Sequence, residues 1–201
     1  MTDLSPLLEV APNFRDIAAH APLTRGLAYR SSELVGMSAQ AQSVLRSLGV
    51  TTVYDLRTQA ERTPSPDSLP EPIHLVIADV LADAPSSGAA ALAALGSGGQ
   101  QVDIAAVNNA IGGGKARDLM IDSYRDFIRL PSANKAYAVF LRGVATTQGS
   151  LAFHCTAGKD RTGWAAALLQ TLAGVDSDTI MEDYLRSNDL VSTKFGPLVD
   201  A

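Results

Sequence analysis

Apolar residues along this 201-residue chain fall into short runs and into longer periodic segments. The short runs cover 50–56, 73–77 and 151–153, and the second follows a turn with four prolines between positions 64 and 72. Short apolar runs bounded by turn residues are typical of buried strands. We therefore predict strands at these three positions.

The longer segments carry apolar residues three or four positions apart, a spacing that predicts helices. In the first of them Val44, Leu45 and Leu48 share one face, and Gly49 ends the helix. The predicted helices cover 39–48, 119–130, 134–144 and 178–187, the last capped by Asp176 or Ser177. A further apolar stretch after Gly163 predicts a helix that begins near residues 160–162.

The order of these elements predicts the fold class. Strands that alternate with helices form α/β folds, in which helices flank a central, mainly parallel sheet. Ligands bind such sheets at the carboxyl ends of the strands. The segment 154–163 follows one predicted strand and precedes a helix, so we expect a catalytic loop between a strand and a helix there.

The segment 83–115 differs from the rest of the chain. It holds runs of small, nearly uncharged residues, among them Gly96-Ser97-Gly98-Gly99 and Gly112-Gly113-Gly114. Such composition predicts a flexible loop region with at most one or two weak helices. Lys115 after the second run is followed by Ala116, where a nucleotide-binding loop needs Ser or Thr. The chain length suits one domain, and we predict a single domain over 1–201.

Composition and charge exclude several classes of function. The net charge of −5 argues against a broad nucleic-acid surface, and a single cysteine excludes an internal disulfide. The longest apolar run is far shorter than the roughly 18–20 residues that span a bilayer, so we predict no integral membrane association. The N-terminus lacks a Sec signal, which predicts a cytoplasmic protein or one exported without a recognisable Sec signal. The three histidines are scattered and predict no metal site.

Residues 154–163 read His-Cys-Thr-Ala-Gly-Lys-Asp-Arg-Thr-Gly. A thiol is a nucleophile only as the thiolate, which a helix N-terminus, a nearby cation and backbone N–H groups all favour. Five residues separate Cys155 from Arg161, enough to wrap once around a phosphate with their amides pointing inward. Gly158 permits a positive φ in the middle of the wrap. The predicted phosphate-binding residues are Thr156, Ala157, Gly158, Lys159, Asp160 and Arg161.

This arrangement predicts phosphomonoester hydrolysis without a metal or other cofactor. The Cys155 thiolate attacks phosphorus, Arg161 binds two equatorial oxygens with its planar fork, and water hydrolyses the resulting cysteinyl-phosphate. We expect Thr162 to donate a hydrogen bond to the sulfur and make it a better leaving group. We expect His154 to order the loop by hydrogen bonds rather than to act as a base.

Other interpretations of the loop differ in strength. A lone intracellular cysteine is usually a small buried hydrophobic residue, and a bare Cys-x5-Arg occurs by chance. Lys159 and Asp160 alone would most often be a solvated charge pair. A rhodanese-like sulfurtransferase or a non-catalytic phosphate-binding module are the alternative functions. The first usually lacks the Gly-Lys-x-Arg-Thr-Gly ending, and the second normally lacks the cysteine or the arginine.

The ten residues resemble the signature loop of the cysteine-dependent phosphatase superfamily. Four further segments resemble the bacterial branch that includes mycobacterial protein tyrosine phosphatase B, namely 13–17, 26–34, 48–57 and 183–188. The resemblance implies a phosphatase fold and action on phosphotyrosine, with phosphoserine, phosphothreonine and phosphoinositides as further substrates in some members. Its partners would be phosphorylated proteins or phospholipids. Branch members continue well past this chain's last residues, which implies either a missing C-terminal lid or a short version.

The general acid that protonates the leaving group has three candidates. Asp79 follows the strand 73–77 and should lie at the same sheet edge as Cys155, and the resemblance implies an acid in the loop after this strand. Asp83 lies four residues further on. Asp160 lies inside the loop, and the resemblance makes it a second candidate for the same role. For any single aspartate a turn or cap is the more common role, which applies to the first two carboxylates, and an ion pair or cap that shapes the loop would explain the third. We favour Asp79.

Overall fold

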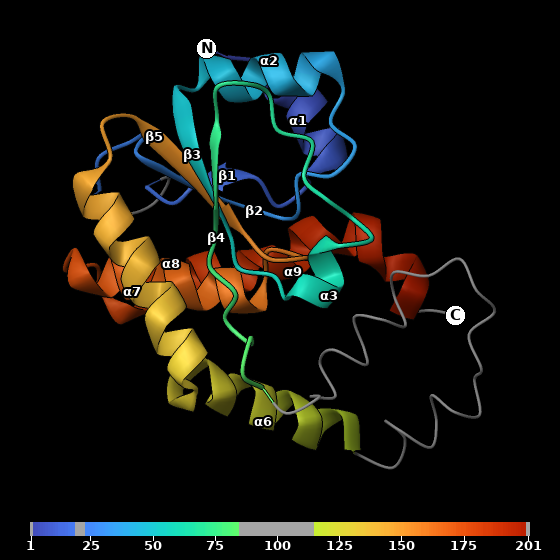
Figure 1. Ribbon diagram of the computed structural model, residues 1–201. Helices are drawn as coiled ribbons and strands as arrows, with labels where there is room; N and C mark the ends of the chain where they lie inside the picture. Colours follow the sequence, from blue (N-terminus) through green and yellow to red (C-terminus); the bar gives the residue numbers. More distant parts are fainter. Residues whose placement is uncertain (1, 19–22, 85–114, 200–201) are drawn as a thin grey trace.

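The computed structural model describes residues 2–18, 23–84 and 115–199 (Figure 1). Its centre is a five-stranded sheet in the order β1-β2-β5-β3-β4. Every neighbouring pair is parallel except β1 with β2, which is antiparallel. The predicted α/β fold with a mainly parallel sheet is therefore confirmed. The strands are β1 (Arg15–Asp16), β2 (Ala28–Ser31), β3 (Val50–Asp55), β4 (His74–Ile77) and β5 (Ser150–His154).

Helices cover both faces of the sheet because its central strands are apolar on both sides. On β5, Leu151 and Phe153 belong to one core cluster, and Ala152 between them belongs to the other. The first cluster includes residues of α7 (Pro131–Thr146) and α8 (Asp160–Leu172), and the second includes residues of α1 (Ser5–Val10) and α2 (Ala39–Ser47). Buried parallel strands require this double cover.

The remaining helices lie around the carboxyl end of the sheet. They are α3 (Gln59–Arg62), α6 (Lys115–Arg129) and α9 (Ser177–Val199), the last of which packs against α8. None of the helices in the described part of the chain has the length and apolar character that crossing a lipid bilayer requires.

Most predicted elements are present, with shifted ends. The helix predicted to end at 187 continues to Val199, and the Ser187 hydroxyl within it is buried and bonded to two arginines. The helix predicted over 119–130 begins at Lys115, the last residue of the predicted flexible region. Most of that region, residues 85–114, lies outside the described residues. The short elements α1, α3, β1 and β2 were not predicted, because each is too short to show a periodic pattern.

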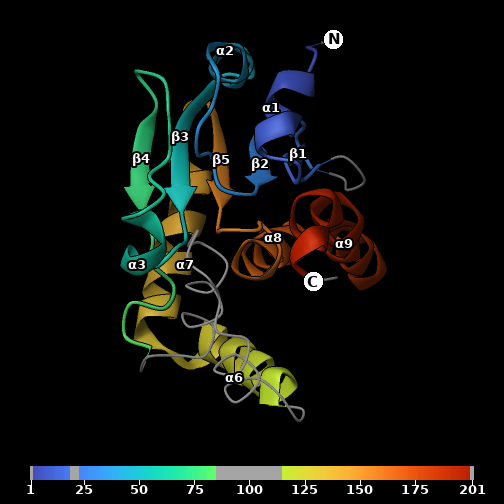
Figure 2. The same cartoon turned by 90° about the vertical axis from the view of Figure 1, so that its right-hand side faces the viewer.

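The register of the parallel strands brings their carboxyl ends together. Asp55 at the end of β3 pairs with His154 at the end of β5 and with Ile77 at the end of β4. Figure 2 shows the strands pointing toward the end of the sheet at which α3 and α8 lie. The chain segments that follow the three strands therefore meet at one edge, and Cys155 and Asp79 both lie there.

Candidate active site

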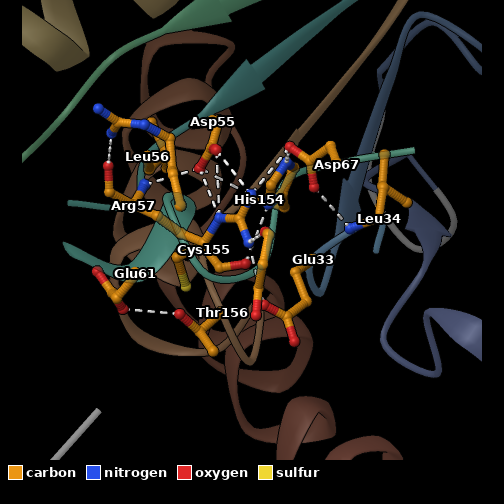
Figure 3. Close-up of polar contacts among 12 residues, drawn as sticks. Glu33, Leu34, Asp55, Leu56, Arg57, Glu61, Asp67, His154, Cys155 and Thr156 are labelled. Atoms are coloured by element: carbon orange, nitrogen blue, oxygen red, sulfur yellow. Dashed lines mark hydrogen bonds and ion pairs between the residues drawn. The ribbon is translucent and has the colours of Figure 1, made fainter. Parts of the chain in front are cut away.

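The loop that carries Cys155 lies between β5, which ends at His154, and α8, which begins at Asp160. This places the thiol before the N-terminus of a 13-residue helix, where unpaired N–H groups and the helix dipole favour an anion. Cys155 is the free cysteine of the chain and is buried. Figure 3 shows its sulfur on the side where Thr156 and Glu61 lie.

Two carbonyl groups of the loop are held from outside by buried side chains. The Asn13 carboxamide nitrogen donates to the Ala157 carbonyl at 3.1 Å and to the Gly158 carbonyl at 2.8 Å. An Arg30 guanidinium nitrogen donates to the same Gly158 carbonyl at 3.0 Å. Asn13 and Arg30 are both fully buried, so these bonds are shielded from water.

Two more carbonyls of the loop are held in the same way. The Glu33 backbone N–H donates to the Thr156 carbonyl at 3.0 Å. The Nδ1 atom of His154 lies 3.0 Å from the Cys155 carbonyl oxygen. Three segments thus each hold part of the loop. They are the segment after α1, the region around β2 and the end of β5. The expectation that His154 orders the loop by hydrogen bonds agrees with this contact.

The contacts of these four carbonyls fix the direction of the N–H groups that follow them in the loop. In a trans peptide the N–H points opposite to the preceding C=O, so outward carbonyls leave the next N–H groups pointing inward. Within the described part of the chain, none of these four N–H groups has a hydrogen-bond acceptor. Consecutive inward N–H groups form an anion-binding nest. The four amides are those of Thr156, Ala157, Gly158 and Lys159.

Gly158 is required by both its conformation and its surroundings. Its φ is +70°, which side-chain-bearing residues rarely adopt. A Cβ atom there would lie 2.1 Å from the Ser31 carbonyl oxygen. The wrap therefore closes against β2 only with glycine at this position, as its predicted role requires.

Arg161 is held by a residue that the sequence did not single out. Its two terminal nitrogens bind the two Glu61 oxygens at 2.7 and 2.6 Å, and Thr156 donates its hydroxyl to the same carboxylate at 2.7 Å. Burial alone would raise the pKa of Glu61, but the hydrogen bonds and charge of Arg161 hold it far below its usual range. Glu61 also closes a capping box with Thr58 at the start of α3. The Thr-x-x-Glu pattern was the available signal, but it indicates a helix start and not a contact with Arg161.

Asp79 lies at the predicted sheet edge and is linked to α3. Its carboxylate accepts the backbone N–H groups of Gln59 at 3.1 Å and Leu81 at 3.0 Å, and Arg62 lies 3.5 Å away. Burial raises its pKa and outweighs the opposing effects of these N–H groups and of the arginine charges. A raised pKa favours the protonated form that a general acid needs. The two backbone contacts also fit the alternative of a capping residue.

The other two acid candidates have different surroundings. Asp83 is exposed and accepts the Ser132 backbone N–H at 3.0 Å at the start of α7, and hydrogen bonds from Ser132 lower its pKa. Asp160 accepts the hydroxyl of Tyr124 on α6, and that hydroxyl also contacts the hydroxyl of Tyr184 on α9. Asp160 is thus bound to the neighbouring helices, as expected of a residue that shapes the loop.

Thr162 is buried in the first turn of α8, and its hydroxyl has no hydrogen-bond partner within the described residues. The predicted hydrogen bond to the Cys155 sulfur is not formed here. Its role in the second step therefore stays a prediction. Lys159, at the N-terminal boundary of α8, is partly exposed.

A buried ion cluster ties α9 to the loop. Asp183 pairs with Arg15 at 2.9 Å and with Arg30 at 2.6 Å. Arg30 reaches the Gly158 carbonyl, and Arg15 contacts the Asn13 side chain that holds the loop. The segments 13–17, 26–34 and 183–188, which carried the family resemblance, therefore meet behind the loop.

One cluster has the composition of a metal site. Ligand atoms of Asp55, Asp67 and His154 lie within 4.8 Å of one another. One Arg57 guanidinium nitrogen lies between the two carboxylates, at 2.8 Å from Asp55 and 3.0 Å from Asp67. A guanidinium already supplies the positive charge that a metal would bring, so the cluster does not fit a metal ion.

Comparison with known proteins agrees with this geometry. Residues 6–199 match the sequence profile of the tyrosine phosphatase family. The chain is 38% identical over 194 residues to the triple specificity protein phosphatase PtpB of Mycobacterium tuberculosis, covering 89% of this chain and 67% of that protein. It is 35% identical over 167 residues to a putative tyrosine-protein phosphatase of Cupriavidus necator, covering 82% of this chain and 54% of that protein. A tyrosine-protein phosphatase of Nostoc commune is 30% identical over 155 residues, 77% of this chain and 46% of that protein. The chain thus spans about half to two thirds of these relatives.

Proposed function

The chain belongs to the tyrosine phosphatase family, and we propose that it hydrolyses phosphomonoesters through a cysteinyl-phosphate intermediate without a metal ion. One observation carries the proposal. Four loop carbonyls are bonded outward, and from this we infer that the four N–H groups that follow them point into the loop. A phosphate dianion needs such a set of donors, and a cysteine that was only a core residue would not.

The first step follows from the placement of these groups. A phosphate ester in the nest has its equatorial oxygens against the amides, and the Cys155 thiolate attacks phosphorus in line with the leaving oxygen. Glu61 binds the end of the Arg161 fork through both terminal nitrogens. The side formed by Nε and one terminal nitrogen remains for two phosphate oxygens. The S–P bond forms as the P–O bond to the alcohol or phenol breaks.

A proton donor and a water molecule complete the cycle. In our proposal Asp79 protonates the departing oxygen, which its position at the sheet edge and its raised pKa support. The resulting carboxylate then takes a proton from the water that attacks the cysteinyl-phosphate. Thr162 would stabilise the leaving thiolate in this second step by turning its free hydroxyl toward the sulfur.

We propose phosphotyrosine as the main substrate, with phosphoserine, phosphothreonine and phosphoinositides as further substrates. The name of the mycobacterial relative, a triple specificity phosphatase, supports the wider range. Lys159 supports it as well, because a second cation beside Arg161 suits polyanionic headgroups.

Hydrolysis of p-nitrophenyl phosphate in the presence of EDTA tests the proposed function. We expect turnover that inorganic phosphate and vanadate inhibit, and loss of turnover after alkylation of Cys155. A sulfurtransferase would instead transfer sulfur from thiosulfate to cyanide, and a binding module would show neither activity. Parallel assays with a phosphotyrosine peptide, a phosphoserine peptide and a phosphoinositide then define the substrate range.

A further inference from the structure

The imidazole ring of His154, the residue before the nucleophile, has two polar contacts. Its Nδ1 atom is 3.0 Å from the Cys155 carbonyl oxygen, and its Nε2 atom is 3.1 Å from an Asp67 carboxylate oxygen. The side chains of His154 and Asp67 are completely buried. Figure 3 shows the ring between Asp67 and the backbone of Cys155.

Both partners of the ring are hydrogen-bond acceptors. A backbone carbonyl can only accept, and an ionised carboxylate can only accept. A neutral imidazole has one N–H group and could satisfy one of these contacts, whereas the imidazolium donates at both nitrogens. We propose that Asp67 is a positioning residue that holds His154 as an imidazolium, so that a fixed positive charge contacts the backbone of the nucleophile Cys155.

The charges around the ring agree with this assignment. Asp55 lies 4.0 Å from Nδ1, and Arg57 binds both Asp55 and Asp67. Glu33 reaches Arg57 from the far side at 3.1 Å. With His154 charged, the carboxylates of Asp55, Asp67 and Glu33 face one guanidinium and one imidazolium, and with His154 neutral they would face the guanidinium alone, which would add an uncompensated negative charge to a buried cluster.

The direction of the pKa shifts is the same for both partners. Burial alone would lower the pKa of His154, but the hydrogen bond and charge of Asp67, together with the charge of Asp55, raise it above its usual value. Burial alone would raise the pKa of Asp67, but His154 and Arg57 lower it. Both shifts therefore favour the ionised form of the group.

The imidazolium has two consequences for the loop. Its Nδ1–H bond fixes the Cys155 carbonyl and thereby aims the Thr156 amide. Its charge, one residue from the nucleophile, favours the thiolate independently of Arg161, because opposite charges attract more strongly in a buried site than in water. The second consequence rests on the proposed function, whereas the charge of His154 does not.

Asp67→Asn separates charge from geometry. The asparagine oxygen can keep the bond that Asp67 accepts from the Leu34 backbone N–H. Its NH₂ group then faces Nε2, which accepts as part of a neutral ring that still donates from Nδ1 to Cys155. The variant therefore preserves both contacts of His154 and removes its positive charge, with loss of the ion pair that the same Asp67 oxygen forms with Arg57.

The first test is ¹⁵N NMR of the three histidines in the full chain. We expect both nitrogens of His154 to be protonated from pH 6 to about pH 8 in the wild type, and Asp67→Asn to convert the ring to the neutral form with the proton on Nδ1. Asp122→Asn, a change at an exposed carboxylate that pairs with Arg125 on α6, is the matched control and should leave His154 charged. A neutral His154 in the wild type at pH 7 would overturn the proposal even if the variant does not fold.

The second test measures the alkylation rate of Cys155 by iodoacetamide as a function of pH. We expect Asp67→Asn to move the midpoint upward by on the order of one pH unit, which means about tenfold less thiolate at neutral pH. An unmoved midpoint with a neutral His154 would show that the charge does not reach the sulfur. Neither test uses turnover, so an inactive enzyme with a charged His154 would refute the proposed function and not this inference.

Discussion

The loop is held in two different ways at its base and at its rim. The base consists of Asn13, Arg30 and His154, which are fully buried and contact backbone carbonyls. The rim consists of Glu61 and Tyr124, which contact the charged side chains Arg161 and Asp160 from helices beside the loop.

The base therefore fixes the geometry of the loop, whereas the rim holds side chains that take part in binding and catalysis. Bonds at the base fix where the amides point, and no group of the substrate competes for them. Bonds at the rim involve Arg161, which a phosphate would also bind. The contact between Arg161 and Glu61 therefore has to shift when a substrate enters. We infer that changes at the base weaken binding and catalysis of all substrates together, whereas changes at the rim depend on the substrate or on the catalytic step. The predictions below test this distinction.

Cys155→Ser removes the nucleophile and leaves base and rim intact. We expect kcat to fall by ~10⁴-fold or more, because a serine hydroxyl does not ionise in the loop. Binding of phosphate esters should persist within a few-fold, measured by calorimetry with a phosphotyrosine peptide. Near-normal turnover of p-nitrophenyl phosphate by this variant would refute the mechanism.

Arg161→Lys keeps the charge at the rim but removes the planar fork. We expect kcat to fall by ~10²–10³-fold, the usual loss for a donor to transition-state oxygens. The lysine can contact only one Glu61 oxygen at a time, so the link to α3 loosens as well. Steady-state kinetics at saturating substrate measure the loss, and an unchanged kcat would make the arginine a structural residue.

Asp79→Asn tests the general acid by its dependence on the leaving group. We expect a loss of ~10²-fold with phosphotyrosine but only a few-fold with an aryl phosphate whose phenol is acidic. The basic limb of the pH–rate profile should flatten, because activity falls as the pH rises through the pKa of the acid.

Asp160→Asn is the paired variant for this test. It should slow all substrates by a similar factor, because Asp160 is bound to Tyr124 and shapes the loop. If the leaving-group dependence appeared in this variant and not in Asp79→Asn, the two roles would have to be exchanged.

Asn13→Asp removes contacts at the base of the loop but keeps the size and shape of the side chain. It removes the N–H donor that serves two loop carbonyls and places a negative charge beside them. A loss of about 2 kcal/mol of loop stabilisation corresponds to ~30-fold in kcat/KM, for good and poor leaving groups alike. Asn134→Asp is a matched control, because Asn134 also donates to two carbonyls, those of Ile128 and Leu130, on the exposed start of α7. A leaving-group-dependent loss in Asn13→Asp would contradict the distinction.

Glu61→Gln should have the smallest effect, since it keeps the size of the side chain and one hydrogen bond to Arg161. We expect kcat to fall about fivefold, which corresponds to about 1 kcal/mol, the typical net contribution of one hydrogen bond. The pKa of Glu61 is depressed, so its contribution to stability is complete above its unfolded pKa and is lost as the pH falls through its folded pKa. The difference in Tm between wild type and variant should therefore be constant near neutral pH and shrink in acid.

The sequence by itself determined those features that depend on neighbouring residues. The short apolar runs predicted β3, β4 and β5, and the ten residues 154–163 predicted the position of the loop and its arginine. Both follow from local rules, because a strand, a sharp wrap around Gly158 and a helix start are all specified within a few residues. The mainly parallel sheet followed from the alternation of strands with helices, whereas the strand order β1-β2-β5-β3-β4 came only from the structure.

Only the tertiary structure decided which distant residues hold the loop. Glu61 lies 100 positions from Arg161, Asp67 lies 87 from His154, and Asn13 lies 145 from Gly158. No periodic pattern links such positions, because their contact is produced by the parallel register that gathers the strand ends at one edge. Among Asp79, Asp83 and Asp160, the sequence alone favoured Asp79 only by its position after a strand. Burial distinguishes Asp79 from Asp83 and a hydrogen bond ties Asp160 to α6, and both are properties of packing rather than of the residue.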